Sequence, residues 1–325
     1  MDEVLRVSSL SVDFKGESSE IHAVRDVSFT LRKGETLGIV GESGCGKSVT
    51  SLAIMGLLPV DKAAIKSGEV IYDGRDLLRL SKSEMRLLIG KELTMIFQDP
   101  ISALDPLFTI ESQIIEGMQI HLGMKKKQAR DLARSLLEDV GMRDVERALK
   151  SYPHQLSGGM IQRVMVSIGL ACNPNVLIAD EPTTALDVTV QAQVLELMNR
   201  LKRKYHSSVV LISHNMGVIA EMCDRVLVMY AGEVVEEIGI NQLFEKPTHP
   251  YTRGLLDCIP RLTKKVEVLP SIPGTLPSAG EEFFGCLFSP RCHFCNSRCE
   301  NERPLMLNVE EGHRVRCHLY EGEAV

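Results

Sequence analysis

Short hydrophobic runs separated by turn residues fill much of the first hundred positions and predict β-strands. Apolar and polar side chains alternate in the first run. The later runs are rich in β-branched and aromatic residues and are bounded by Lys-Gly-Glu or Asp-Gly turns. The predicted strands cover residues 4–13, 27–31, 36–40, 69–72 and 93–97. A helix is expected to begin just after 36–40 and to end at about Leu58.

Apolar residues recur at spacings of three and four between about 105 and 172, which predicts helices at Ile110–Leu122, Lys125–Val140 and Gly159–Ala171. Strands and helices then alternate. The predicted order is strand Val176–Asp180, helix Val190–Lys204, strand Val209–Ser213, helix Asn215–Glu221, and strands Arg225–Tyr230 and Glu233–Glu237. Such alternation implies a parallel sheet covered on both faces. The chain is therefore predicted to be an α/β protein with an inserted helical subdomain at about 105–172.

The texture changes after about residue 245, where eight of the 14 prolines lie. Long regular elements are not expected there, because proline interrupts helices and sheet ladders. We therefore predict one domain over residues 1–245 and a small, irregular, cysteine-rich domain over 246–325.

Composition narrows the function classes. Hydrophobic residues make up 44% and charged residues 25%, as in soluble globular proteins. A net charge of −6 argues against a general nucleic-acid binder. No apolar run approaches the roughly 18 residues needed to span a bilayer, and the acidic N-terminus does not look like a secretory signal. A cytosolic location is expected, so that any membrane role would come through partners.

Residues 41–48, Gly-Glu-Ser-Gly-Cys-Gly-Lys-Ser, form a complete phosphate-binding loop between a predicted strand and a predicted helix. Its glycines let the backbone wrap around phosphate at a helix N-terminus. Lys47 would add positive charge on the β- and γ-phosphates, and the Ser48 hydroxyl would ligate Mg²⁺.

Carboxylates and a histidine follow two later strands. Asp180 and Glu181 end a buried strand run, where Asp180 would hold Mg²⁺ and Glu181 would polarise the attacking water as general base. His214 comes one strand later and would hydrogen-bond the γ-phosphate or that water. A solvent-exposed or core histidine without such a role is the ordinary alternative for a residue of this type.

Ser157, with Gly158 and Gly159, precedes a predicted helix, so Ser157 is a plausible N-cap. The same position also suits a second anion site at a helix N-terminus. One chain has no second phosphate group for that site. The pattern therefore indicates a dimer in which this motif closes over ATP held by the other subunit.

These motifs, taken in order, resemble those of the ATP-binding subunits of ABC transporters over residues 1 to about 245. The set comprises the phosphate loop, Gln98, Leu-Ser-Gly-Gly at 156–159, Asp180-Glu181, Ala-Leu-Asp at 185–187 and Ser213-His214. Further motifs resemble the oligopeptide/dipeptide (and nickel) importer branch, which also carries a cysteine-bearing tail. They are Phe-Gln-Asp-Pro at 97–100 with Ala-Leu-Asp-Pro at 103–106, Tyr-Pro-His-Gln-Leu-Ser-Gly-Gly-Met at 152–160, and His-Pro-Tyr-Thr-Arg at 249–253.

The resemblance implies a RecA-like P-loop core with an antiparallel β-subdomain and assigns further roles. Gln98 would contact Mg²⁺ and water, Asp187 would lie at the dimer interface, and Phe14 would stack on adenine. Ser157, Gly158 and Gly159 would contact the partner's ATP. The implied ATP-binding residues are Phe14, Ser43, Gly44, Cys45, Gly46, Lys47, Ser48 and Val49.

Cysteines raise two separate questions. Cys45 lies near a helix N-terminus, which lowers a thiol pKa, so a redox switch competes with the simpler reading of a small side chain filling a tight loop. Five of the nine cysteines lie within 286–317. Four thiolates could hold a [4Fe–4S] cluster or a zinc ion, or these could be free cysteines in a packed loop. The spacing does not decide between the metals, whereas the resemblance favours iron–sulfur on Cys286, Cys292, Cys299 and Cys317 and leaves Cys295 as an extra.

The sequence thus predicts an ATP-hydrolysing subunit of an importer for peptides, with nickel or another small ligand as an alternative cargo. A soluble ABC ATPase of translation or DNA repair is the rival class. By resemblance, the partners would be two membrane permease subunits, a second and non-identical ATPase, and indirectly an extracytoplasmic binding protein, but no nucleic acid. The chain would sit peripherally at the cytoplasmic face of the membrane.

Overall fold

The chain enters each of two structural units more than once. A computed structural model describes residues 2–16, 19–184, 186–259, 271–277 and 283–322 of the 325. The first unit comprises residues 1–5, 31–36 and 72–211, and the second comprises 6–30, 37–71 and 212–325.

The second unit contains five strands hydrogen-bonded in the order β11-β12-β10-β9-β3. β3 (Thr36–Val40) pairs in parallel with β9 (Arg225–Tyr230), and β9 pairs antiparallel with β10 (Glu233–Gly239). Every residue of β3 and β9 is buried, as the continuous apolar runs in their sequences predict. Both strands were predicted from the sequence, and the structure confirms them. They lie beside the phosphate loop.

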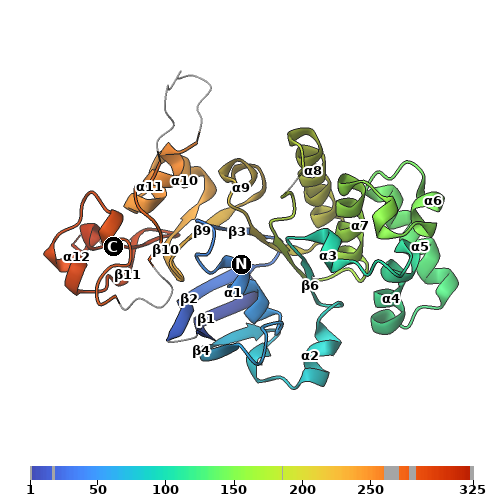
Figure 1. Cartoon of the computed structure of the whole chain (residues 1–325), viewed down its shortest axis with the longest axis horizontal. Helices are drawn as coiled ribbons and strands as arrows, with labels where there is room; N and C mark the ends of the chain where they lie inside the picture. The colour runs from blue at the N-terminus through green and yellow to red at the C-terminus, as the bar shows by residue number, and fades with distance from the viewer. Residues whose placement is uncertain (1, 17–18, 185, 260–270, 278–282, 323–325) are drawn as a thin grey trace. The chain divides into compact units, whose positions relative to one another are not determined.

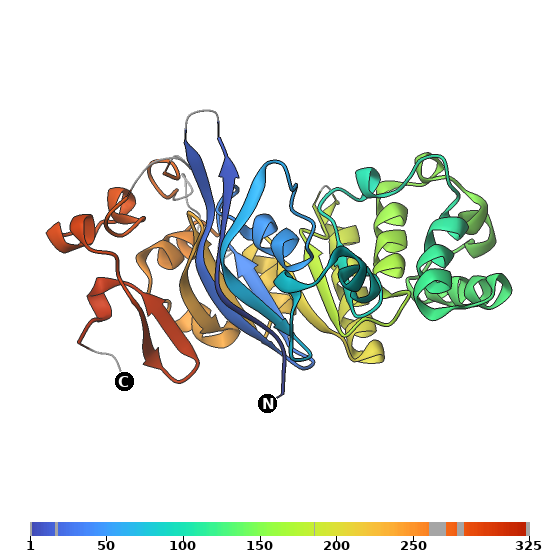
Figure 2. The ribbon, with the colours of Figure 1, turned by 90° about the horizontal axis from the view of Figure 1, so that it is seen from below.

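The elements of the C-terminal tail are short, as expected, but some of them join this sheet. β12 (His313–Arg316) pairs antiparallel with β10 and with β11 (Met306–Glu310), a hairpin drawn in red in Figure 2. α10 (Ile240–Glu245) precedes the tail. The helices in the described part of the tail are α11 (Pro250–Asp257), η3 (Ser289–Arg291), α12 (Ser297–Asn301) and η4 (His318–Tyr320). β10 lies before the domain boundary predicted at 245/246 and β12 lies after it, so their pairing crosses that boundary. The division into two domains at this position stays a prediction.

Three longer strands of the second unit pair in the order β2-β1-β4, and Figure 2 shows β1 and β2 side by side in blue. β1 (Glu3–Lys15), β2 (Glu20–Arg32) and β4 (Ala63–Tyr72) all extend beyond the predicted runs. The bounds of β1 lie close to the prediction, whereas the first parts of β2 and β4 were missed because most of their residues are exposed or half-buried and many are polar. α1 (Lys47–Ile54) ends before Leu58, because Gly56 turns the chain with φ +63°.

The first unit contains three strands in the order β8-β7-β6, with β6 (Leu93–Ile96) parallel to β7 (Val176–Asp180). β8 (Ser208–Ile212) follows α8 (Val188–Tyr205), close to the predicted bounds. All residues of the three strands are buried. A short hairpin strand and two short helices precede β6: β5 (Arg75–Asp76), η1 (Leu77–Arg79) and α2 (Lys82–Leu88).

Helices occupy the stretch between β6 and β7, where Figure 1 shows them packed together in green. They are α3 (Pro100–Ala103), α4 (Ile110–Leu122), α5 (Lys126–Asp139), α6 (Val145–Lys150), η2 (Pro153–Gln155) and α7 (Gly158–Leu170). α4 contacts α5, α6 and α7. α2 was not predicted, although its capping box of Ser81 and Glu84 is a readable signal. Within the described part of the chain, no helix has the length and apolar character to cross a membrane.

His249 sits at the start of α11 and is buried, with 1% of its surface exposed. Its Nδ1 accepts a hydrogen bond from the backbone N–H of Tyr251 at 3.1 Å. Burial lowers the pKa of His249 to about 4, although the nearby Glu236 carboxylate favours the charged ring. The neutral imidazole is therefore the form that the fold accommodates.

We predict that this histidine makes stability depend on pH in the window between about 6.5 and 4. The unfolded chain takes up the proton first, so the free energy of unfolding falls by about 2 kcal/mol between pH 7 and pH 5 on account of this group. His249→Asn keeps an N-cap acceptor but cannot titrate. Denaturant unfolding at both pH values should show the fall in wild type and not in the variant; equal falls would refute the assignment.

Candidate functional site

The phosphate loop lies so close to its neighbours that two of its positions exclude a side chain. A Cβ on Gly41 would lie 2.2 Å from the carbonyl oxygen of Met229 in β9. A Cβ on Gly46 would lie 2.4 Å from the carbonyl oxygen of Ala23 in β2, and Gly46 has φ +103°. Gly44 also has a positive φ, +84°, but a Cβ there would meet nothing within 4 Å. The loop is thus pressed against two strands at its ends and open at its middle.

Lys47 is buried, with 5% of its surface exposed, at the first position of α1. Its Nζ donates hydrogen bonds to the carbonyl oxygens of Gly41 and Glu42, both at 2.9 Å. The ammonium group is therefore held over the loop itself. Ser48 and Val49 follow, half-buried, in the same first turn, while Ser43 is exposed.

Cys45 belongs to the phosphate loop and is completely buried. Burial raises the pKa of its thiol, and the opposing influence of the Lys47 charge is smaller. The expectation that the helix N-terminus lowers this pKa is therefore wrong, because desolvation outweighs it. A small side chain filling a tight loop is the reading that agrees with this environment.

Two further predicted residues belong to the same unit as the phosphate loop. Phe14 lies near the end of β1 and is half-buried. His214 is exposed and comes just before Asn215, whose side chain caps α9 (Met216–Met222) by accepting from the N–H of Gly217 at 2.9 Å. The cap determines where the chain turns after β8 and so places His214 at the turn.

The first unit brings two predicted catalytic residues together. Gln98 Nε2 donates to Glu181 Oε2 at 3.1 Å, and Thr184 Oγ1 donates to the same oxygen at 2.9 Å. Glu181 has φ +47°, a strained backbone for a residue with a side chain. Asp180, the last residue of β7, is buried with 4% exposure. Thr184, which lies in the same turn three residues after Glu181, was not predicted from the sequence.

Ser157 is the N-cap of α7, as predicted, but its side chain makes no capping hydrogen bond. Ser157 and Gly158 are exposed, and a Cβ on Gly159 would lie 3.0 Å from Val190 Cγ1 in α8. Asp187 also has a structural role that was not predicted from the sequence. Its carboxylate caps α8 by accepting from the N–H groups of Thr189 and Val190 at 3.0 Å.

The C-terminal tail supplies contacts to the phosphate loop that the sequence did not predict. Arg291 donates two hydrogen bonds to the carboxylate of Glu42, at 2.7 and 2.9 Å. The Tyr251 hydroxyl accepts from the backbone N–H of Glu42 at 2.9 Å. Tyr251 belongs to the His-Pro-Tyr-Thr-Arg motif, which was a visible signal, whereas nothing in the local sequence marks Arg291.

Four of the tail cysteines line one small pocket together with Phe288 and Phe294: Cys286, Cys292, Cys299 and Cys317. This is the set that the resemblance implied, and Cys295 is not in the lining. Burial raises the pKa of Cys286 to about 12 and that of Cys317 to about 11. Among the described residues, no group of three or more His, Cys, Asp or Glu side chains is arranged to hold a metal ion. The structure therefore gives the predicted metal no direct support.

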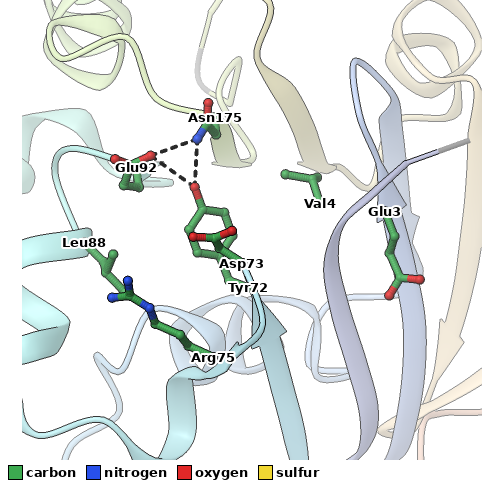
Figure 3. Close-up of a pocket in the computed structure, with 8 residues that line it drawn as sticks. All are labelled: Glu3, Val4, Tyr72, Asp73, Arg75, Leu88, Glu92 and Asn175. Carbon is green, nitrogen blue, oxygen red and sulfur yellow. Dashed lines mark hydrogen bonds between the residues drawn. The ribbon is translucent and has the colours of Figure 1, made fainter.

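A pocket of about 330 Å³ in the first unit contains none of the predicted site residues. Figure 3 shows Tyr72, Glu92 and Asn175 joined in a triangle of hydrogen bonds. Asn175 Nδ2 donates to the Tyr72 hydroxyl at 2.9 Å and to the Glu92 carboxylate at 2.8 Å. Burial raises the pKa of Tyr72 to about 12. These contacts join Asn175, just before β7, to Glu92, just before β6, and to Tyr72, the last residue of β4, which is a structural role.

Comparisons with known proteins agree with this architecture. Residues 24–184 match the ABC transporter family, and residues 235–299 match the oligopeptide/dipeptide transporter C-terminal region. The chain is 47% identical over 323 residues to the oligopeptide transport ATP-binding protein AppD of Bacillus subtilis, covering 99% of this chain and 98% of that protein. It is 45% identical over 315 residues to the dipeptide transport ATP-binding protein DppD of Escherichia coli, covering 97% and 96%.

A solved structure extends the comparison to the fold. A dimeric ATP-binding cassette in a post-hydrolysis state with ADP and Pi aligns with a TM-score of 0.66 at 28% identity, covering 73% of this chain and 99% of that one. Fold and phosphate loop together define an ABC ATPase, which couples ATP hydrolysis to transport. The chain belongs to the ABC transporter ATP-binding proteins, in the branch that carries the oligopeptide/dipeptide transporter C-terminal region. The resemblance drawn from the sequence motifs is confirmed.

The close packing of the phosphate loop predicts different costs for two alanine substitutions. Gly44→Ala and Gly46→Ala share the penalty of a positive φ, but only the second also forces a Cβ into a backbone carbonyl. Gly46→Ala should lower the free energy of unfolding by about 2 kcal/mol more than Gly44→Ala does. Denaturant unfolding without nucleotide measures both values, and equal losses would contradict the packing described.

Proposed function

We propose that this chain is the ATP-hydrolysing subunit of an importer that takes up di- or oligopeptides. The observation that carries the proposal is that relatives named for oligopeptide and dipeptide transport match along nearly their whole length, C-terminal region included. Nickel or another small ligand remains the alternative cargo. The match to the oligopeptide/dipeptide transporter C-terminal region disfavours a soluble ATPase of translation or repair, because such a protein would not need that region.

In this proposal Lys47 and the loop backbone bind the phosphates, and Phe14 stacks on adenine. Ser48, Gln98 and Asp180 would hold Mg²⁺, which would neutralise negative charge on the phosphates. The ATP-contacting set is Phe14, Ser43, Gly44, Cys45, Gly46, Lys47, Ser48 and Val49.

Glu181 is the proposed general base, oriented by hydrogen bonds from Gln98 and Thr184 to one of its oxygens. His214 would contact the γ-phosphate. Ser157, Gly158 and Gly159 would close over ATP bound by a second ATPase, and the unused Ser157 side chain supports this role. Asp187 would reach the same interface.

Several large apolar side chains that follow Gln98 support docking to membrane partners. Ile101 is 63% exposed, Leu107 79% and Phe108 55%. Exposed apolar side chains are a feature of interaction surfaces. We infer that this region contacts the membrane partners of the importer, which would comprise two permease subunits, a non-identical second ATPase and, indirectly, an extracytoplasmic binding protein. The chain would then be peripheral at the cytoplasmic face.

The finer domain organisation is part of the same proposal. The strands β1, β2 and β4 would form the antiparallel β-subdomain, and the helices within about 105–172 the helical subdomain. Residues 246–325 would form a small C-terminal domain. The dense contacts of α4 with α5, α6 and α7 support the second of these assignments.

Glu181→Gln should uncouple ATP binding from hydrolysis and abolish uptake. The amide keeps the size of the side chain but cannot act as a base, so turnover should fall by about a hundredfold or more while ATP still binds. Cells carrying the variant as their sole copy should fail to accumulate a labelled dipeptide.

Purification of the tagged wild-type protein from its native membranes tests the proposed partners. Two multi-span chains and a second ATPase should accompany it. Normal turnover in Glu181→Gln would refute the role of Glu181. Normal dipeptide uptake beside a lost ATPase would refute the cargo, and recovery of ribosomal or repair proteins would favour the soluble class.

We further infer that the tail cysteines bind a [4Fe–4S] cluster in place of a single zinc ion. Two features support a site on these four cysteines: they line one pocket, and Cys295 is left out of it. The resemblance to the importer branch is what favours the iron–sulfur cluster over zinc. The cluster would serve a structural role.

Anaerobically purified protein should contain about four irons and four sulfides per chain and absorb visible light as an iron–sulfur protein. Cys286→Ser and Cys317→Ser should lose iron, whereas Cys295→Ser should keep it. One zinc per chain would establish the zinc alternative, and metal-free protein would establish free cysteines. Equal iron loss in Cys295→Ser would overturn the ligand set.

A further inference from the structure

One ion pair, between the buried Arg291 and the half-buried Glu42, joins the C-terminal tail to the phosphate loop. Arg291 ends the short helix η3, and its side chain is 4% exposed. Nη1 and Nη2 donate to the two carboxylate oxygens of Glu42 at 2.7 and 2.9 Å. This two-pronged arrangement is the strongest geometry in which a guanidinium binds a carboxylate, and it fixes direction as well as distance.

The guanidinium is itself fixed by the region around it. Nε donates to the carbonyl oxygen of Pro273 at 2.8 Å, and Nη2 to that of Ile272 at 3.3 Å. The central carbon lies 5.7 Å from the centroid of the Tyr230 ring, at the end of β9. Arg291 therefore offers Glu42 a rigid partner, which a solvent-exposed arginine would not.

Glu42 is held at three points. Its carboxylate binds Arg291, its N–H donates to the Tyr251 hydroxyl at 2.9 Å, and its carbonyl accepts from Lys47 Nζ at 2.9 Å. Tyr251 is fully buried and packs against Tyr230 and Phe288, with ring centroids 4.7 and 5.5 Å apart. The second residue of the phosphate loop is thus positioned by side chains from more than 200 residues further along the chain.

Charge gives this contact a consequence for nucleotide binding. An uncompensated carboxylate in a loop that receives the phosphates of ATP repels them, and partial burial of Glu42 strengthens that repulsion. Arg291 compensates the charge of Glu42 and holds its carboxylate in one place. We propose that Arg291, aided by Tyr251, is a positioning residue for the phosphate loop, through which the C-terminal tail sets the affinity for ATP. This inference rests on the proposed role of the loop in binding ATP.

Equilibrium binding of MgATP to the full-length chain tests the inference. Arg291→Ala should weaken binding by about tenfold, the loss of one charge-assisted contact. Adding Glu42→Gln to Arg291→Ala should restore most of that loss, because it removes the exposed charge. In steady-state hydrolysis, Arg291→Ala should raise KM for ATP and leave kcat at saturating ATP within about twofold.

Arg253→Ala is the matched control. Arg253 donates to the Pro247 carbonyl and the Tyr320 hydroxyl, both in the tail. It should bind ATP as wild type does. A merely structural role of Arg291 would not be rescued by Glu42→Gln, because the double variant lacks the ion pair as well. If Arg291→Ala is insoluble, Arg291→Gln with and without Glu42→Gln gives the same comparison.

Lys47→Ala distinguishes failure of the phosphate loop assignment from failure of the positioning role of Arg291. If Lys47→Ala binds ATP as wild type does, the phosphate loop assignment itself fails. If Lys47→Ala abolishes binding while Arg291→Ala binds normally, only the positioning role of Arg291 fails. Failure of Glu42→Gln to restore affinity, or an equal loss in Arg253→Ala, overturns the inference as well.

Discussion

The second unit is organised around a backbone-to-backbone contact that leaves no room for side chains. The phosphate loop lies against the carbonyl groups of Met229 and Ala23, at distances that only glycine permits. The turn after β9 completes the contact, because the N–H of Gly232 donates to the carbonyl of Cys45 and its own carbonyl accepts from the N–H of Arg25. These backbone contacts position both ends of the loop, and the side chains of Lys47, Tyr251 and Arg291 add hydrogen bonds there, so the open middle of the loop remains available to a ligand.

Strain and burial are placed where chemistry is expected. Glu181 has a left-handed backbone that costs about 1–3 kcal/mol, and it sits between a fully buried strand and a turn that presents Thr184 to its carboxylate. In the phosphate loop, Cys45 illustrates the opposite case. Its burial makes the thiol less acidic and ties it to packing. Position near a helix N-terminus was a poor guide there, because it says nothing about desolvation.

Much of the fold followed from apolar periodicity. The buried strands β3, β6, β7, β8 and β9 and the helices α4, α5, α7 and α8 lie close to their predicted bounds, because continuous or three-four spaced apolar runs specify them locally. The outer parts of β2 and β4 escaped prediction, since their residues are half exposed and read as polar. The motifs located the loop, Gln98 and Glu181. The contact of Arg291 with Glu42 joins residues 249 positions apart, and no local pattern encodes such a pairing.

The pairing of β12 with β10 has a consequence for how such tails can be exchanged. β10 would present an unpaired edge if β12 were removed, and unpaired edges invite association with other chains. Arg225 and Arg314, one from each neighbouring strand, both bind the carboxylate of Glu237 on β10. A tail grafted from a relative would have to reproduce that shared carboxylate and the register beside it. The β12 strand of the tail is therefore part of the same sheet as β10. Changes in the sequences of β10 and of the tail are expected to occur together.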